Sequence, residues 1–285
     1  TGFRYFVTDS MQMNSTVGAL TIGRYQSTDT YYLYLNSAWN IVGPMSIYSY
    51  QVEPRQNLTV TGSGNQIYIK CANWIITGSS TTLQTNGGNI VFWANADKAA
   101  GVAGNGGGIK LGTSTTLRSQ GGSIYLGGGR DDGGSDSNIP NMRGWSSMAA
   151  GDGLPDGYAN GSNVADADPG VILSTGYSIL SNGGDVFIAG QDATTNPNSG
   201  TSATVLVYTG TIDSGTGRIG VWGKASAMSS AIWNMGVYLH GVNGENVDTG
   251  STWHSANRSA QAITIYGDSS ANTSQYAYGV SSRYY

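Results

Sequence analysis

Carboxylates gather in one glycine-rich stretch of the sequence, at about residues 127–169. They occur in the segments 131–136 and 151–157, which read DDGGSD and GDGLPDG. Carboxylate oxygens in flexible loops are ligands that Ca²⁺ takes, so a candidate calcium site consists of Asp131, Asp132, Asp136, Asp152 and Asp156. Their spacing matches neither an EF-hand nor the nine-residue calcium-binding repeat. Solvated aspartates in turns are therefore the favoured interpretation.

The same carboxylates suggest a second kind of chemistry, the cleavage of a polysaccharide. Gly129-Arg130-Asp131-Asp132 and Leu239-His240-Gly241 are similar to fragments of the polygalacturonase signatures. Glycoside cleavage needs two carboxylates at a defined separation on a rigid support. Here they lie in an insertion, and no Ile-Lys pair follows the histidine. We expect no catalytic residues, and a carbohydrate-active enzyme, hydrolase or lyase, is the alternative function.

Other residue types with metal or redox chemistry are sparse. His240 and His254 are fourteen positions apart without a second ligand pair nearby, so their spacing predicts no metal site. Cys71 is the single cysteine, which excludes an internal disulfide framework and indicates a buried structural thiol. We therefore expect no cofactor other than the candidate Ca²⁺.

The elements that would position these residues follow from a repeated phrase. Leu83-Gln84-Thr85-Asn86-Gly87-Gly88-Asn89-Ile90 returns, with substitutions, at residues 117–124 and 179–186, and more loosely at 60–67 and 212–219. In each copy an aliphatic residue is followed seven positions later by a second one, across a polar turn with glycine. Such self-similarity predicts a β-solenoid. A β-sandwich is the alternative, but that fold does not require the same turn sequence between successive strands.

The spacing of the copies predicts three strands in each coil. The shortest interval, from Val60 to Leu83, is 23 residues and leaves room for a third strand, represented by residues 74–76, 109–111, 171–173, 205–207 and 237–239. Longer intervals gain their extra residues after the second strand. The insertions, the longest at about 127–169, are therefore expected along one edge of the solenoid.

A column of outward-facing side chains follows from strand alternation. If Ile67, Ile90, Ile124 and Val186 point inward, their successors point outward in register on one face. Trp93 and Trp222 would widen this column, so the predicted apolar stripe comprises Tyr68, Val91, Trp93, Tyr125, Phe187 and Trp222. An exposed stripe of this kind favours contact with a glycan ring or a neighbouring protein. The alternative is that the inserted loops fold back and bury it.

The composition of the chain disfavours two classes of binding partner. The 285 residues include 44 glycines, only 11% are charged, and the net charge is −4 without a basic run. Nucleic acid and anionic membranes are therefore poor partners, and no stretch reaches the length of a membrane-spanning helix. The low Lys and Glu content suits a secreted product, and we expect the chain to be a mature or excised segment of a longer protein.

The repeated phrases also carry a family resemblance. Residues 83–97, Gly108-Ile109-Lys110-Leu111-Gly112 and residues 121–129 resemble the filamentous-haemagglutinin-like large exoproteins of bacteria. The resemblance covers roughly Leu20 to Tyr266 and implies a right-handed parallel β-helix, in long surface or secreted proteins that include adhesins and toxin-delivery stalks. It implies no catalytic residues.

These observations together predict an all-β protein, a right-handed parallel β-helix with three strands per coil. Residues 1–19 are expected to extend or cap it, residues 20–266 to form it, and the aromatic residues 267–285 to form a tail or cap. The expected function is that of an extracellular or cell-surface structural and adhesive rod. It would self-associate end to end into fibres, since open-ended heterologous contacts build filaments, or contact neighbouring surface proteins and glycans.

Overall fold

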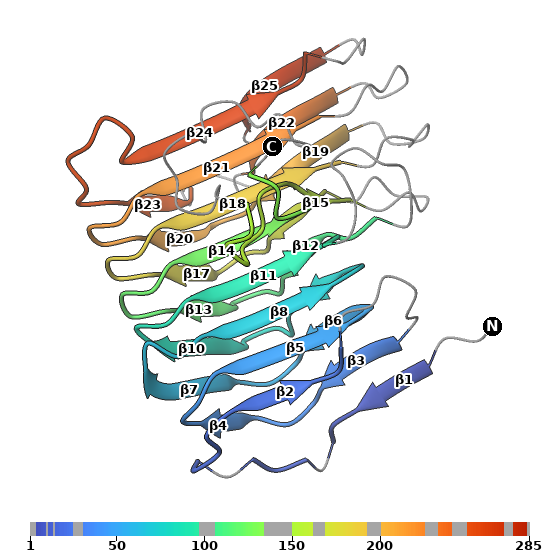
Figure 1. Ribbon diagram of the computed structural model, residues 1–285. Helices are drawn as coiled ribbons and strands as arrows, with labels where there is room; N and C mark the ends of the chain where they lie inside the picture. The colour runs from blue at the N-terminus through green and yellow to red at the C-terminus, as the bar shows by residue number, and fades with distance from the viewer. Residues whose placement is uncertain are drawn as a thin grey trace.

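The protein is a right-handed parallel β-helix (Figure 1). The computed structural model describes residues 4–9, 11–13, 15–24, 31–96, 106–133, 150–161, 169–192, 201–225, 233–240, 250–270 and 276–283. Among these residues there is no helix, and so none that could cross a membrane. The predicted fold class is confirmed.

Three parallel sheets run the length of the rod, and the chain visits them in a fixed order. Sheet A contains β1 (Arg4–Val7), β3 (Tyr31–Leu35), β6 (Gln51–Pro54), β9 (Ile75–Ile76), β12 (Ile109–Leu111), β16 (Val171–Leu173), β19 (Thr201–Val207), β22 (Trp233–His240) and β25 (Tyr276–Arg283). Sheet C contains β4 (Trp39–Ile41), β7 (Leu58–Ser63), β10 (Thr82–Asn86), β13 (Thr116–Arg118), β17 (Tyr177–Leu180), β20 (Gly210–Asp213) and β23 (Thr252–His254). Sheet B contains β2 (Leu20–Ile22), β5 (Met45–Ser49), β8 (Ile67–Cys71), β11 (Ile90–Ala94), β14 (Ile124–Gly128), β18 (Val186–Gln191), β21 (Ile219–Lys224) and β24 (Ile263–Asp268), and β15 (Ala159–Asn160) pairs with β18.

The repeated aliphatic positions stack directly over one another. On sheet C, Leu83 pairs with Leu117, Leu117 with Ile179, and Ile179 with Ile212. All four side chains are buried in one core that runs through the coils, together with the matching columns of sheets A and B. Because each fully buried aliphatic side chain contributes about 1.5–3 kcal/mol, these columns supply the main stabilisation of the rod.

One predicted register is wrong. Val60 was expected to stack on Leu83, but Leu83 pairs with Leu58, and the ladder then shifts by two residues before Asn86 meets Ser63. The bare coil is therefore 25 residues, from Leu58 to Leu83, and β7 holds a bulge. Val60 still lies in the core, because strand alternation brings every second residue to the inside.

The glycine pairs of the repeated phrase make the corner between sheets C and B. The first glycine of each pair has positive φ, as at Gly121 with +115°. The second has no room for a side chain, since a Cβ at Gly122 would lie 2.1 Å from the carbonyl oxygen of Gly88 in the preceding coil. Buried hydroxyls complete the corner by donating to the carbonyl three residues on, in the pairs Thr85–Gly88, Ser119–Gly122, Ser181–Gly184 and Ser214–Gly217.

The two longest connections, from β11 to β12 and from β14 to β16, run from a strand of sheet B to the next strand of sheet A, so the predicted insertions along one edge are confirmed. The connection from β22 to β23 differs, because it runs from sheet A to sheet C. Strands also occur in both terminal segments. The predicted N-terminal extension contributes β1, which pairs with β3, and the predicted tail contributes β25, which pairs with β22.

Candidate functional site

The strap, residues 150–161, is the described part of the long insertion that lies against sheet B. Gly128 and Gly157 exchange two backbone hydrogen bonds of 3.0 and 2.9 Å. Further along, Ala159 and Asn160 pair with Gly190 and Gln191, so β15 adds a short extra rung beside β18. The strap is therefore joined to the sheet through main-chain hydrogen bonds at both of these points.

The outward column of sheet B is buried, so the predicted exposed stripe is wrong and the alternative of a covered face is the one observed. The register is as expected, because Val91 pairs with Tyr68 and Tyr125, and Tyr125 pairs with Phe187. However, five of the six predicted contact residues are at most 3% exposed: Val91, Trp93, Tyr125, Phe187 and Trp222. Only Tyr68 is half-buried.

This column forms a second hydrophobic cluster outside the solenoid core. Tyr158 and Leu154 of the strap pack in it with Phe187 and Trp222, whose ring centroids are 5.3 Å apart. The indole Nε1 of Trp93 donates to the carbonyl oxygen of Gly129 at 2.7 Å. The aromatic residues therefore fix the inserted segment to the rod and present no open binding surface.

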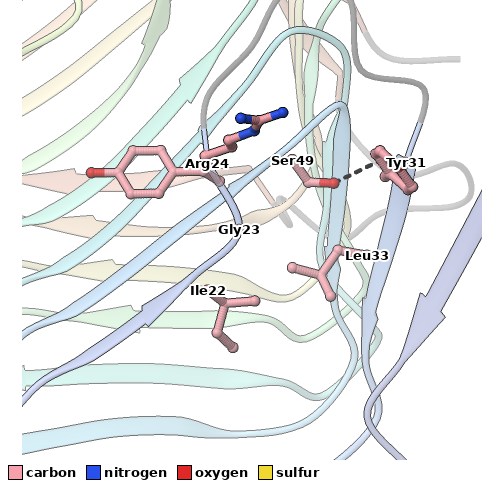
Figure 2. Close-up of a pocket in the computed structure, with 7 residues that line it drawn as sticks. Ile22, Gly23, Arg24, Tyr31, Leu33 and Ser49 are labelled. Carbon is pink, nitrogen blue, oxygen red and sulfur yellow. Dashed lines mark hydrogen bonds between the residues drawn. The ribbon is translucent and has the colours of Figure 1, made fainter.

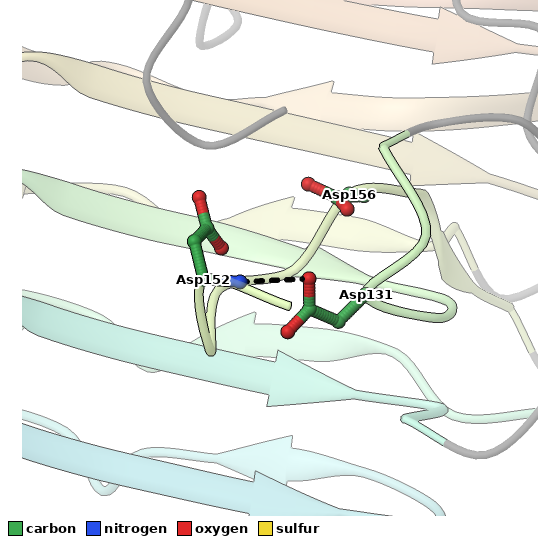
Figure 3. Close-up of side chains that lie close together, drawn as sticks. All are labelled: Asp131, Asp152 and Asp156. Carbon is green, nitrogen blue, oxygen red and sulfur yellow. Dashed lines mark hydrogen bonds between the residues drawn. The ribbon is translucent and has the colours of Figure 1, made fainter. Parts of the chain in front are cut away.

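Three of the five predicted calcium ligands come together at the base of the strap (Figure 3). Carboxylate oxygens of Asp131, Asp152 and Asp156 lie within 4.8 Å of one another. Asp132 is not part of this group, and Asp136 lies outside the described residues. Three carboxylates at this distance provide oxygen ligands of the kind that a divalent cation takes.

The same carboxylates hold the strap through backbone amides. Asp131 accepts hydrogen bonds from the amides of Gly151, Asp152 and Gly153 at 2.5, 3.2 and 2.8 Å. Asp156 accepts one from the Gly133 amide at 2.6 Å. The two aspartates thus tie residues 131–133 to the strap from opposite sides, which is a structural use of the acidic cluster.

The environment of Asp156 favours its protonated form. Burial raises the pKa of the Asp156 carboxyl to about 7, and the nearby charges of Asp152 and Asp131 add to this rise, while the Gly133 amide opposes it. A carboxyl group of this pKa can hold or release a proton near neutral pH.

The arrangement fits glycoside cleavage poorly. Glycoside cleavage uses a pair of carboxyl groups that flank the scissile bond, whereas here three carboxyl groups cluster, with oxygens within 4.8 Å of one another. Both oxygens of Asp131 are also occupied by amides of the strap. Of the histidines, His254 lies in β23 and contacts Asp213 at 3.0 Å, while His240 in β22 packs on Tyr208, so the structure does not bring them to the acidic cluster.

The two ends of the rod carry the exposed apolar residues. Among the described residues, the exposed large hydrophobic side chains lie in the first two coils (Val7, Met11, Tyr31, Val42) or in the last coil (Ile263, Ile265, Tyr278, Val280). In Figure 1 these coils are the two ends of the stack, marked by β1 to β5 and by β23 to β25. Sequence reasoning missed this concentration, although the aliphatic column that ends at Ile263 was a signal for it.

The last coil is a rung of the core without a rung above it among the described residues. Ile263 pairs with Ile219 and Val280 with Val237, both of which are fully buried. Ile263 and Val280 themselves are 42% and 44% exposed. Positions that are interior in every central coil are therefore open to solvent at this end.

Comparison of the chain with protein-family models, with curated proteins and with solved structures finds no match.

Proposed function

We propose that this protein is a structural rod of an extracellular or cell-surface assembly, and that its copies stack head to tail. The observation that carries the proposal is the confinement of exposed large apolar side chains, among the described residues, to the two ends of the rod. Exposed apolar groups of this kind favour contact with another surface.

A second copy suits these ends better than an unrelated partner. The last coil offers one free strand edge from each sheet, at β23, β24 and β25. The first coil offers β1 and β2 in sheets A and B, and the Val17 carbonyl there accepts hydrogen bonds from the amides of Val42 and Gly43. Stacking of a second copy would therefore continue the ladders of sheets A and B with their apolar columns.

The secreted location rests on composition and on the resemblance to filamentous-haemagglutinin-like exoproteins. A chain with 11% charged residues and 44 glycines depends on stacked coils for its stability, as extended surface proteins do. Contact with neighbouring surface proteins belongs to the same proposal. Glycan contact through the aromatic column finds no support, since that column is buried.

Sedimentation velocity over a range of protein concentrations tests head-to-tail stacking. We expect the average mass to rise with concentration and electron micrographs to show rods longer than one molecule. The double variant Ile263→Lys/Val280→Lys should remain monomeric, because two charges would be buried unpaired in each contact.

A matched control is Thr59→Lys/Ser178→Lys, which adds the same charges on the outer face of sheet C, where both side chains are half-buried. This control should associate like the unmodified protein. A protein that stays monomeric at every concentration, or a control that dissociates as readily as the end variant, would contradict the proposal.

The proposal is of a protein without catalytic activity. A carbohydrate-active enzyme predicts turnover of an acidic polysaccharide that is lost in Asp131→Asn and Asp156→Asn. We expect no such turnover in assays that follow reducing ends and unsaturated products. Release of either product, abolished by these substitutions, would replace the structural role by an enzymatic one.

A further inference from the structure

A pocket lies between residues of β2, β3 and β5 and the two residues that follow β2, near the N-terminal end of the rod. Its volume is about 370 Å³, within the range of about 300–1,000 Å³ that small-molecule sites occupy. Figure 2 shows the residues that line it: Ile22, Gly23, Arg24, Tyr31, Leu33, Tyr48 and Ser49. Along sheet B the strands β8 and β11 separate the pocket from β14 and β18, which hold the strap, and the pocket and the strap share no residue.

The apolar part of the pocket is the end of the solenoid core. Ile22 pairs with Ile47, and Leu33 pairs with Val52, so both continue interior columns. Leu33 is buried, and Ile22 is partly buried against the core. In Figure 2 these two side chains lie at one end of the pocket and the guanidinium of Arg24 lies at the other.

Local backbone chemistry places Arg24 at the rim. Gly23 has a φ of +72°, and a Cβ there would lie 2.0 Å from the carbonyl oxygen of Tyr48. Only glycine fits such a left-handed, close approach, so the chain turns sharply after β2 and carries Arg24 over the opening. The hydroxyl of Ser49 donates to the carbonyl oxygen of Tyr31 at 2.8 Å, which ties the opposite wall together.

Arg24 is available for a ligand. Within the described part of the chain, no carboxylate forms an ion pair with its guanidinium, and its side chain is exposed. A guanidinium presents donors in a planar fork that matches a carboxylate with two parallel hydrogen bonds. Tyr31 and Tyr48 add aromatic surface to the lining of the pocket.

We propose that this pocket binds a small organic carboxylate with an apolar body, held by Arg24 at the charged end and by Ile22 and Leu33 at the apolar end. The ligand class follows from the combination of Arg24, which has no ion pair among the described residues, with the apolar side chains of Ile22 and Leu33. A neutral apolar molecule would form no ion pair with Arg24, and an inorganic anion would make no apolar contact with Ile22 and Leu33.

The test uses 4-phenylbutyrate and its uncharged amide as probes, followed by calorimetry. The protein carries Ile263→Lys/Val280→Lys, so that end-to-end stacking does not interfere. We expect saturable binding of the acid, with the amide at least about tenfold weaker, because hydrogen bonds between a guanidinium and a carboxylate are stronger than those to a neutral amide.

Two substitutions separate the ends of the pocket. Arg24→Gln should remove the difference between acid and amide, whereas Arg118→Gln, which changes an arginine on the outer face of sheet C, should leave it intact. Ile22→Trp should weaken both probes by filling the apolar end. The proposal is overturned if acid and amide bind alike, if neither binds at millimolar concentration, if Arg24→Gln behaves as Arg118→Gln does, or if acetate and inorganic phosphate bind as tightly as the acid.

Discussion

Asp156 shows how a single side chain makes the attachment of the strap depend on pH. Its pKa rises from 3.8 to about 7 in the folded protein, chiefly because the group is buried. The folded chain therefore binds a proton more tightly than the unfolded chain, and stability is lost as that proton dissociates.

We expect the free energy of unfolding to fall as pH rises from about 4 to about 7, by on the order of 1.4 kcal/mol for each unit of pKa difference. In Asp156→Asn, which keeps an acceptor for the Gly133 amide without the charge, this contribution should disappear. Thermal unfolding of both proteins between pH 4 and 8 measures it. Equal slopes would show that Asp156 titrates normally.

The same measurement with added calcium examines the candidate cation site. A divalent cation among Asp131, Asp152 and Asp156 would favour the ionised carboxyl groups and would therefore reduce the loss of stability near neutral pH. A pH profile that calcium leaves unchanged leaves the three carboxylates with the structural role alone.

Gly122 tests the close approach of successive coils. Because a Cβ there would lie 2.1 Å from a backbone oxygen, Gly122→Ala should cost about 1–3 kcal/mol or more through displacement of the backbone. Gly250→Ala is the matched control, since nothing lies within 4 Å of its Cβ, and it should be nearly neutral. Denaturant unfolding compares the two variants, and equal stabilities would show that the coils can move apart at little cost.

At the scale of elements, the hydrophobic cluster between sheet B and the strap holds the strap against the sheet. Tyr158 of the strap, Tyr125 of β14 and Phe187 of β18 are all buried in this cluster. The sequence predicted these strand residues as an outward column, and the direction was right. The sequence left open whether the inserted loops cover this column, because the residues of the strap show no strand period that would place them against it.

Truncation of the Phe187 side chain should therefore lower the stability of the protein. We expect Phe187→Ala to destabilise the protein by about 3–5 kcal/mol and to speed hydrogen exchange in β14, β18 and the strap. Val42→Ala, at a side chain that is 43% exposed, should change stability by less than about 1 kcal/mol. A small effect of Phe187→Ala would restore the exposed stripe as the correct description.

At the scale of the whole molecule, the rod is a stack whose interior continues to both ends. The central coils bury their columns fully, but Ile263, Ile265 and Val280 of the last coil do not. Association through such a surface is driven by removal of apolar area from water, which ordinary salt screens little and sulfate strengthens.

We accordingly expect head-to-tail association to persist from 0.1 to about 1 M sodium chloride and to increase in sodium sulfate. Sedimentation velocity at matched ionic strength measures both effects. Dissociation of the assemblies by sodium chloride alone would indicate that ion pairs, and not the apolar rungs, join the copies.

The sequence by itself determined the solenoid, the three-strand coil and the edge that carries the insertions. These are local properties of the sequence: a period of two along each strand, an offset of seven across the turn, and a hydroxyl with two glycines at the corners that carry the repeated phrase. They can be recognised without knowledge of the tertiary packing. Even the one register error, at Val60, came from a two-residue bulge that keeps the same alternation.

Only the tertiary structure decided what is exposed. Whether Trp93 and Phe187 meet solvent depends on strap residues that are distant in the sequence, since Tyr158 lies 65 positions after Trp93 and 29 positions before Phe187. The meeting of Asp131 with Asp152 and Asp156 depends on the same strap. The pocket beside Arg24 and the exposure of Ile263 and Val280 likewise depend on which side chains of neighbouring coils pack together, and no repeated phrase encodes that packing.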